Sequence, residues 1–199
     1  LIDKSGDQHY DIVSALIKSI RGSDPNAAVY WLARMIEGGE DVKFIARRLL
    51  ISASEDIGNA NPTALVLATG CFQAVEMIGY PEAQIVLSQC AVYLACSPKS
   101  NASYSAIKVA LKAVQQSGDL PVPLHLRNAP TALMKKQGYG ADYRYAHDFP
   151  GHFVEQEYLP EALVGTKFYE PAANVREEEM RRYLAHHWKK STATESPRS

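Results

Sequence analysis

The sequence predicts an all-α fold: an antiparallel helical bundle, followed by an irregular extension rich in Pro and Tyr and by a final polar helix. Two observations support this prediction. Apolar residues recur at helical spacing over most of residues 8–127, and glycine or proline separates one periodic stretch from the next. The alternation typical of a strand does not occur in this region. The connections are short, which favours antiparallel neighbours and therefore a stacked bundle.

Six helices are expected in the bundle, each with its own start and stop signals. Asp7 is predicted to cap the first helix, which stops at Gly22, and Pro25 suits the first turn of the second. The third is expected to end at Gly58. The fourth stretch is apolar almost all round, as expected for a helix in the middle of a bundle. The expected helices lie at about residues 8–21, 25–37, 40–57, 62–78, 81–97 and 100–116.

The texture changes after Asp119, where prolines rule out a continuous helix. A short helix can restart near Thr131, and the following tyrosine-rich chain is expected to be ordered, with room for a brief hairpin. Asn174, with Glu177 three residues on, predicts the cap of the last helix. The expected organisation is a bundle at 1–118, an extension packed on the bundle at 119–173, a helix at 174–190 and a flexible tail at 191–199.

Composition narrows the class of protein. The 199 residues, 46% of them hydrophobic, suit one compact domain with a short appendage. The net charge of -1 excludes a globally basic nucleic-acid binder but permits local basic patches. Three cysteines without CxxC spacing indicate reduced thiols, and no apolar stretch could span a bilayer, so we expect a soluble, cytoplasmic protein without a membrane partner. The first residue, Leu1, suggests a piece of a longer protein.

The sequence contains no motif of known catalytic chemistry. The phosphate-binding pattern GxxxxGK[ST], the metal pattern HExxH and the nucleophile pattern GxSxG are all absent, so we assign no catalytic, cofactor-binding or metal residue. One set in irregular chain could converge on a metal, but scattered surface histidines are the favoured interpretation, and an enzyme built on the set is the least favoured hypothesis. The set is His125, His147, Asp148 and His152.

Two acids at a helix end, Glu55 and Asp56, oppose the helix dipole unless something offsets their charge. We expect an ion pair with Arg47 or Arg48, and the alternative is a functional contact across subunits.

A basic stretch interleaved with tyrosines is the candidate DNA contact. Basic side chains there outnumber the two acids, and such a segment can bind phosphates and stack on unpaired bases. The competing interpretation is a solvated loop face, and the sequence leaves both open. The candidate residues are Arg127, Lys135, Lys136 and Arg144, with His125 and His147 nearby.

Several long strings, which together cover about residues 3–185, resemble one family. They are GDQHYD (6–11), RGSDPN (21–26), YWLARM (30–35), ARRLLISASEDIGNANP (46–62), YLACSPKSNASY (93–104), LPVPLHLRNAPTALMKKQGYG (120–140) and YRYAHDFP (143–150). The chain resembles the C-terminal part of the replication-associated recombination protein A family, also called MgsA. Its members are AAA+ ATPases related to clamp loaders and to the Werner helicase interacting protein.

The resemblance implies a homotetrameric ATPase that acts in replication, recombination and repair at stalled forks, on single-stranded gaps or duplex ends. Its C-terminal region is helical and builds the tetramer, like a clamp-loader collar. The ATPase motifs would lie upstream of Leu1, so ATP and Mg²⁺ belong to the parent protein and no catalytic residue carries over to this chain. Replication proteins are possible further partners. The rival hypothesis is a free-standing helical adaptor that recruits a replication partner, and a Walker motif upstream would discriminate the two.

Overall fold

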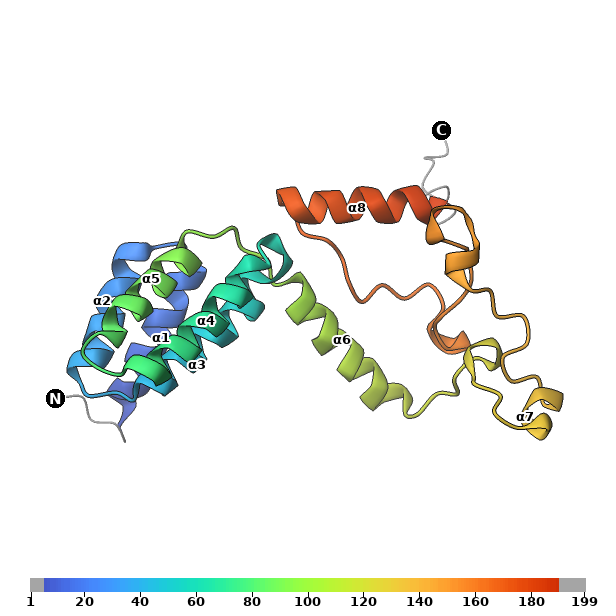
Figure 1. The fold of residues 1–199 in the computed structure, drawn as a ribbon, viewed down its shortest axis with the longest axis horizontal. Helices are drawn as coiled ribbons and strands as arrows, with labels where there is room; N and C mark the ends of the chain where they lie inside the picture. The colour runs from blue at the N-terminus through green and yellow to red at the C-terminus, as the bar shows by residue number, and fades with distance from the viewer. Residues whose placement is uncertain (1–5, 190–199) are drawn as a thin grey trace. The chain divides into compact units, whose positions relative to one another are not determined.

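A computed structural model describes residues 6–189, and every regular element in that range is helical (Figure 1). The predicted all-α class is therefore confirmed. Two compact units divide the chain. We call residues 6–106 with 169–178 the helical body, and residues 107–168 with 179–189 the extension. Each unit is described by itself.

Five helices form the helical body (Figure 1). In chain order, α1 packs against α2, α2 against α5, α5 against α4 and α4 against α3. Their apolar faces meet in one core, whose largest fully buried side chains include Leu16, Met35, Ile45, Leu49 and Leu87. The bounds are α1 Asp7–Arg21, α2 Pro25–Glu37, α3 Val42–Ser52, α4 Thr63–Ile78 and α5 Ala83–Ala95. The periodic residues of the sequence thus form the core of a bundle.

The helix starts follow the sequence signals with one exception. Asp24 caps α2, because its side chain accepts a hydrogen bond of 2.9 Å from the backbone N–H of Ala27, and Pro25 occupies the first turn as expected. The prediction that Asp7 caps α1 is wrong: the helix begins at Asp7, and Gly6 stands at the cap without a side-chain hydrogen bond. Asp7 instead places its charge in the first turn, beside the unpaired N–H groups.

The helix expected at 40–57 changes type before it ends. After α3 comes a π-helical turn, η1 Ala53–Ile57, and then a 3₁₀ turn, η2 Gly58–Ala60. Gly58 has a φ of 50°, and a Cβ atom there would lie 3.1 Å from the carbonyl oxygen of Ser100. Glycine is therefore required both by the backbone angle and by the close approach of a second segment. A π turn inside a helix is rare and is frequent at functional sites.

The extension consists of helix, short turns and irregular chain. The elements that belong to it wholly or in part are α6 Ala102–Ser117, η3 Leu124–Leu126, α7 Ala132–Lys136, η4 Ala146–Asp148, η5 Pro150–His152, η6 Glu161–Leu163 and α8 Val175–His187. The helix expected near Thr131 is α7, and the Thr131 hydroxyl caps it with a hydrogen bond of 3.2 Å from Met134 N–H. The hairpin is not found among residues 6–189, where 3₁₀ turns stand instead.

The compact units do not follow the boundaries expected from the sequence. Residues 107–118 group with the extension, and residues 169–178 return to the helical body. The expected packing of 119–173 on the bundle stays a prediction. The expected tail at 191–199, and the last residue of the helix expected at 174–190, lie outside the described residues. Within residues 6–189 there is no helix whose length and apolar character would let it cross a membrane.

Candidate functional site

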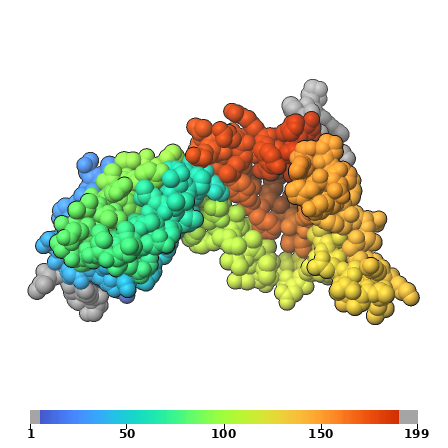
Figure 2. All heavy atoms as spheres, in the orientation of Figure 1, coloured from blue at the N-terminus to red at the C-terminus, as the bar shows by residue number. Residues whose placement is uncertain are grey.

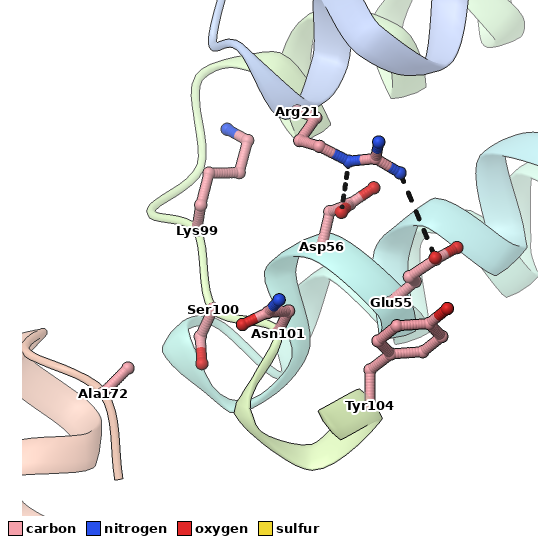
Figure 3. A pocket seen from close by; sticks show the side chains of 8 residues that line it. All are labelled: Arg21, Glu55, Asp56, Lys99, Ser100, Asn101, Tyr104 and Ala172. Atoms are coloured by element: carbon pink, nitrogen blue, oxygen red, sulfur yellow. Dashed lines mark hydrogen bonds and ion pairs between the residues drawn. The ribbon is translucent and has the colours of Figure 1, made fainter. Parts of the chain in front are cut away.

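A polar pocket of about 480 Å³ lies in the helical body beside the π turn (Figure 3). Its side chains come from the end of α1, from η1, from the loop that leads into α6 and from the segment before α8. They are Arg21, Glu55, Asp56, Lys99, Ser100, Asn101, Tyr104 and Ala172. Most lie in the strings SEDIGNANP and SPKSNASY, so the pocket gathers residues from two parts of the sequence.

An ion pair between Arg21 and Asp56 crosses this pocket (Figure 3). The Nε of Arg21 donates a hydrogen bond of 2.8 Å to Oδ1 of Asp56, and Nη2 lies 4.0 Å from Oε1 of Glu55. The hydrogen bond to Asp56 is the main reason why the pKa of Arg21 is raised. The Asp56 side chain is 6% exposed, and its Oδ2 has no hydrogen-bond partner among the described residues. A buried carboxylate without this arginine would be costly.

The predicted partners of the two acids were wrong. Glu55 and Asp56 pair with Arg21 of α1, whereas the expected partners were Arg47 and Arg48 of α3. The physical reason is the π turn, which carries the acids past the end of α3 and toward the last turn of α1. Within the described part of the chain, Nε of Arg48 is buried without a partner.

The loop that precedes α6 is fixed to this site by its backbone and by one lysine. Ser100 N–H donates to the carbonyl oxygen of Asp56 at 2.8 Å. Nζ of Lys99 donates to the carbonyl oxygens of Ala95 and Ser97, at 3.0 and 2.6 Å, and to the hydroxyl of Ser23 at 3.0 Å. Burial lowers the pKa of Lys99, although the nearby Cys96 and Asp56 oppose that shift. The three ammonium hydrogens are therefore used inside the fold.

A buried carboxylate holds the start of α8. Glu177 is 0% exposed, and its oxygens accept hydrogen bonds from the hydroxyl of Tyr169 at 2.8 Å, from Ala172 N–H at 3.1 Å and from the amide of Asn174 at 2.9 Å. The expected cap is confirmed, since Asn174 accepts from Glu177 N–H at 3.0 Å. Burial raises the pKa of Glu177, but these bonds and one from Ser100 outweigh it, so the pKa is lowered.

The pocket joins segments of the chain. Its acids and bases bond to one another or to backbone groups, and they include no nucleophile held by a base of the kind hydrolysis needs. The site therefore locks two distant segments onto the bundle. Sequence reasoning noticed Glu55 and Asp56 but missed Arg21, which lies 35 residues away from Asp56 and carries no local signal of the pairing.

The structure gives two of the candidate DNA-contacting residues roles inside the extension. Nε of Arg127 donates to the carbonyl oxygen of Val122 at 2.8 Å, and its guanidinium carbon lies 4.8 Å from the ring centroid of Tyr139. Nη2 of Arg144 donates to the carbonyl oxygen of Glu155 at 2.6 Å. Both side chains therefore spend donors on their own chain.

The two candidate lysines are placed differently. Lys135 and Lys136 lie in the last turn of α7, and both are exposed. The chain after α7 returns to Leu124, whose carbonyl oxygen accepts from Gly140 N–H at 2.8 Å. The structure thus brings Arg127 and α7 into one closed loop. Arg144 is bound to residues 155 and 156 instead.

The histidines do not converge. His125 Nε2 is 2.6 Å from the carbonyl oxygen of Glu157, whereas Nδ1 of His147 is 2.8 Å from Nδ1 of His152. Across residues 6–189 we find no group of three or more metal-ligating side chains.

Charge is divided unevenly between the two units. The helical body carries 13 acidic and 8 basic side chains, a net charge of -5, and the extension carries 7 acidic and 10 basic ones, a net charge of +3. The neutral total therefore conceals a basic part, which includes the four candidate residues.

Comparison with known proteins gives consistent matches. A family model described as MgsA AAA+ ATPase C terminal matches residues 22–188. Replication-associated recombination protein A of Coxiella burnetii is 52% identical over 170 residues, 85% of this chain and 39% of that protein. The protein of that name from Escherichia coli K12 is 49% identical over 85% of this chain and 38% of its own length. ATPase WRNIP1 of Dictyostelium discoideum is 48% identical over 85% of this chain and 20% of its own length. The chain spans about two fifths of these bacterial relatives.

Proposed function

Because the chain belongs to the family of MgsA AAA+ ATPase C-terminal domains, we propose that it is the oligomerisation domain of an ATPase that acts in DNA replication and recombination. The names of the relatives support the process, since they are replication-associated recombination proteins. ATP and Mg²⁺ are used by the parent protein, and this chain is not catalytic alone, because it lacks the glycine-rich phosphate cradle and its lysine.

The observation that carries the oligomerisation proposal is the lack of a core in the extension. Of its described residues, Val154 alone is a buried hydrophobic side chain. Ordering a residue costs about 1–2 kcal/mol of backbone entropy, and apolar burial is the main term that offsets it. Many large apolar side chains of the extension are exposed, among them Ile107, Leu111, Val114, Val122, Leu124, Leu133, Tyr145 and Val164. Further copies of the chain would cover them.

Light scattering tests this proposal directly. The chain has a mass of 21.9 kDa, and we expect four times that mass at micromolar concentration. Leu111→Asp, which places a charge on the exposed apolar face of α6, should lower the mass. The matched control is Gln116→Asp, an exposed polar position near the end of the same helix, which should leave it unchanged. A wild-type chain that remains monomeric at every concentration would contradict the proposal.

We further propose that the extension gives the assembled protein weak, salt-sensitive contact with DNA, single-stranded or at fork ends. Its net charge of +3 and the exposure of Lys135 and Lys136 support this. Four copies would repeat a weak site, and avidity would strengthen it. Arg127 and Arg144 would contribute through the donors that their contacts with Val122 and Glu155 leave over.

The alternative is a helical adaptor that recruits a replication protein and works outside an ATPase. Both functions need an apolar surface, so the oligomeric state separates them: an adaptor would be monomeric alone and bind its partner through the same face.

A further inference from the structure

We propose that the exposed apolar face of α6 in one copy docks into an apolar groove in the extension of a second copy. The inference rests on the proposed oligomerisation and names the two surfaces that would make it. Both surfaces belong to the extension, so each copy carries one helix face to give and one groove to receive. Such a contact can repeat around a closed assembly.

The groove lies between two proline-containing segments, residues 120–127 and 157–164, and its volume is about 790 Å³. Two polar contacts fix its walls. The ring of His125 lies 2.6 Å from the carbonyl oxygen of Glu157 and joins the two segments, and Arg127 braces one of them through the carbonyl oxygen of Val122. The apolar lining includes Leu120, Val122, Leu124, Leu159 and Val164. The groove is therefore preformed and apolar, as a helix-binding groove needs to be.

The helix face consists of three apolar side chains at positions i, i+4 and i+7. Ile107, Leu111 and Val114 are 56%, 54% and 55% exposed, and no residue of α6 is buried. Figure 2 shows α6, in yellow-green, open on the face in view. Three aliphatic anchors at this spacing form the recognition pattern of a helix that lies in an apolar groove.

The two surfaces agree in length. Seven residues of α-helix rise about 10 Å, which is the distance that the three anchors span. Residues 120–124 contain two prolines, and extended chain of this kind advances about 3.1 Å per residue, or about 12 Å over the groove wall. All three anchors can therefore meet the groove at once.

Charge adds direction to the contact. Glu161 stands at the groove and is exposed, and Glu157 spends one carboxylate oxygen on Leu159 N–H, at 2.9 Å. Lys112, adjacent to Leu111 on α6, is exposed. An ion pair from Lys112 to Glu161 of the second copy would fix the register and direction of the helix.

The last part of α8 is the other apolar helix face in the extension, but its own chain already covers part of it. His187 stacks on Phe153 with ring centroids 4.6 Å apart, and Tyr183 packs edge-on against His187 at 4.5 Å. The anchors of α6 have no comparable ring contact in the described chain, so α6 is the helix that the groove fits.

Cysteine cross-linking tests the contact. Leu111→Cys and Val164→Cys are combined in one chain whose exposed Cys96 is changed to Ser, while Cys71 and Cys90 are buried. Under mild oxidation we expect dimers and larger species on a non-reducing gel. Each single variant should give none, and neither should the control pair Gln116→Cys with Val164→Cys.

Charge reversal gives a second readout in light scattering. Lys112→Glu should raise the dissociation constant of the assembly several-fold, and Glu161→Lys in the same chain should restore it. If the chain is oligomeric but the cysteine pair links only within one chain, or not at all, the docking inference is overturned and the oligomerisation stands. A monomeric chain overturns both.

Discussion

Replacing Glu177 by Gln removes one negative charge from a fully buried site and changes the shape of the side chain little. The wild-type oxygens face only donors: the hydroxyl of Tyr169, the N–H of Ala172 and the amide of Asn174. An amide would turn its own NH₂ toward one of these groups. Because a hydrogen bond to a charged group contributes about 1.5–3 kcal/mol, and an unpaired buried donor costs about as much, we expect a loss of about 2–4 kcal/mol.

Urea unfolding followed by circular dichroism measures this loss, at one fixed protein concentration because assembly stabilises the fold. Glu179→Gln is the matched control, since Glu179 is exposed on the same helix and should change the stability by less than about 0.5 kcal/mol. Hydrogen exchange at Ala172 N–H should become faster in Glu177→Gln alone. Equal stability of Glu177→Gln and wild type would refute the account of this site.

The same comparison has a pH dependence of known sign. The pKa of Glu177 is lowered in the folded state from its ordinary value of 4.5. Its contribution to stability is therefore fully present above that value and is lost as the pH falls through the lowered pKa. The stabilities of wild type and Glu177→Gln should converge under acid conditions, below about pH 4. A gap that stays constant between pH 7 and pH 3 would show that the charge is not the cause.

Three further changes test other parts of the account. Gly58→Ala should destabilise the helical body by about 1–3 kcal/mol, because its φ is 50° and its Cβ would crowd Ser100, whereas Gly70→Ala in α4, with open space around it, should be neutral or stabilising in thermal unfolding. Titration of the chain with Mg-ATP in a calorimeter should be flat, and micromolar binding would reveal a site without a phosphate cradle. Lys135→Ala with Lys136→Ala should keep the assembled mass and reduce the salt slope of single-strand binding by about 0.7 per lost phosphate contact, and an unchanged slope would assign these lysines to solvated surface.

The helices of the body could be predicted because their signals are local. Pro25 and Gly58 mark a start and an end that the structure confirms, and residues such as Leu16 and Leu49 repeat at the period of a helix that buries one face. Asp7 shows the limit, since a capping residue type one position inside a helix carries the same signal in the sequence.

The polar site could be predicted only in part. Glu55 and Asp56 looked misplaced at a helix end, and that observation was sound, but the search for a partner was confined to neighbouring turns of the same helix. Arg21 reaches them only after the bundle has formed. The burial of Glu177 was equally out of reach, because its cap with Asn174 is local whereas its bond from Tyr169 and its enclosure depend on tertiary packing.

The π turn at Ala53–Ile57 limits how this domain can change length. A π turn holds one residue more than the α-helical turn it replaces, and an α-helix advances by 100° per residue. Deleting a single residue between Ser52 and Gly58 would let the turn relax to ordinary α-helix, and Asp56 would swing by about a quarter of a circle away from Arg21. A natural variant that gains or loses one residue here should therefore also have changed its ion pair, so that insertion, glycine and arginine are inherited as a unit.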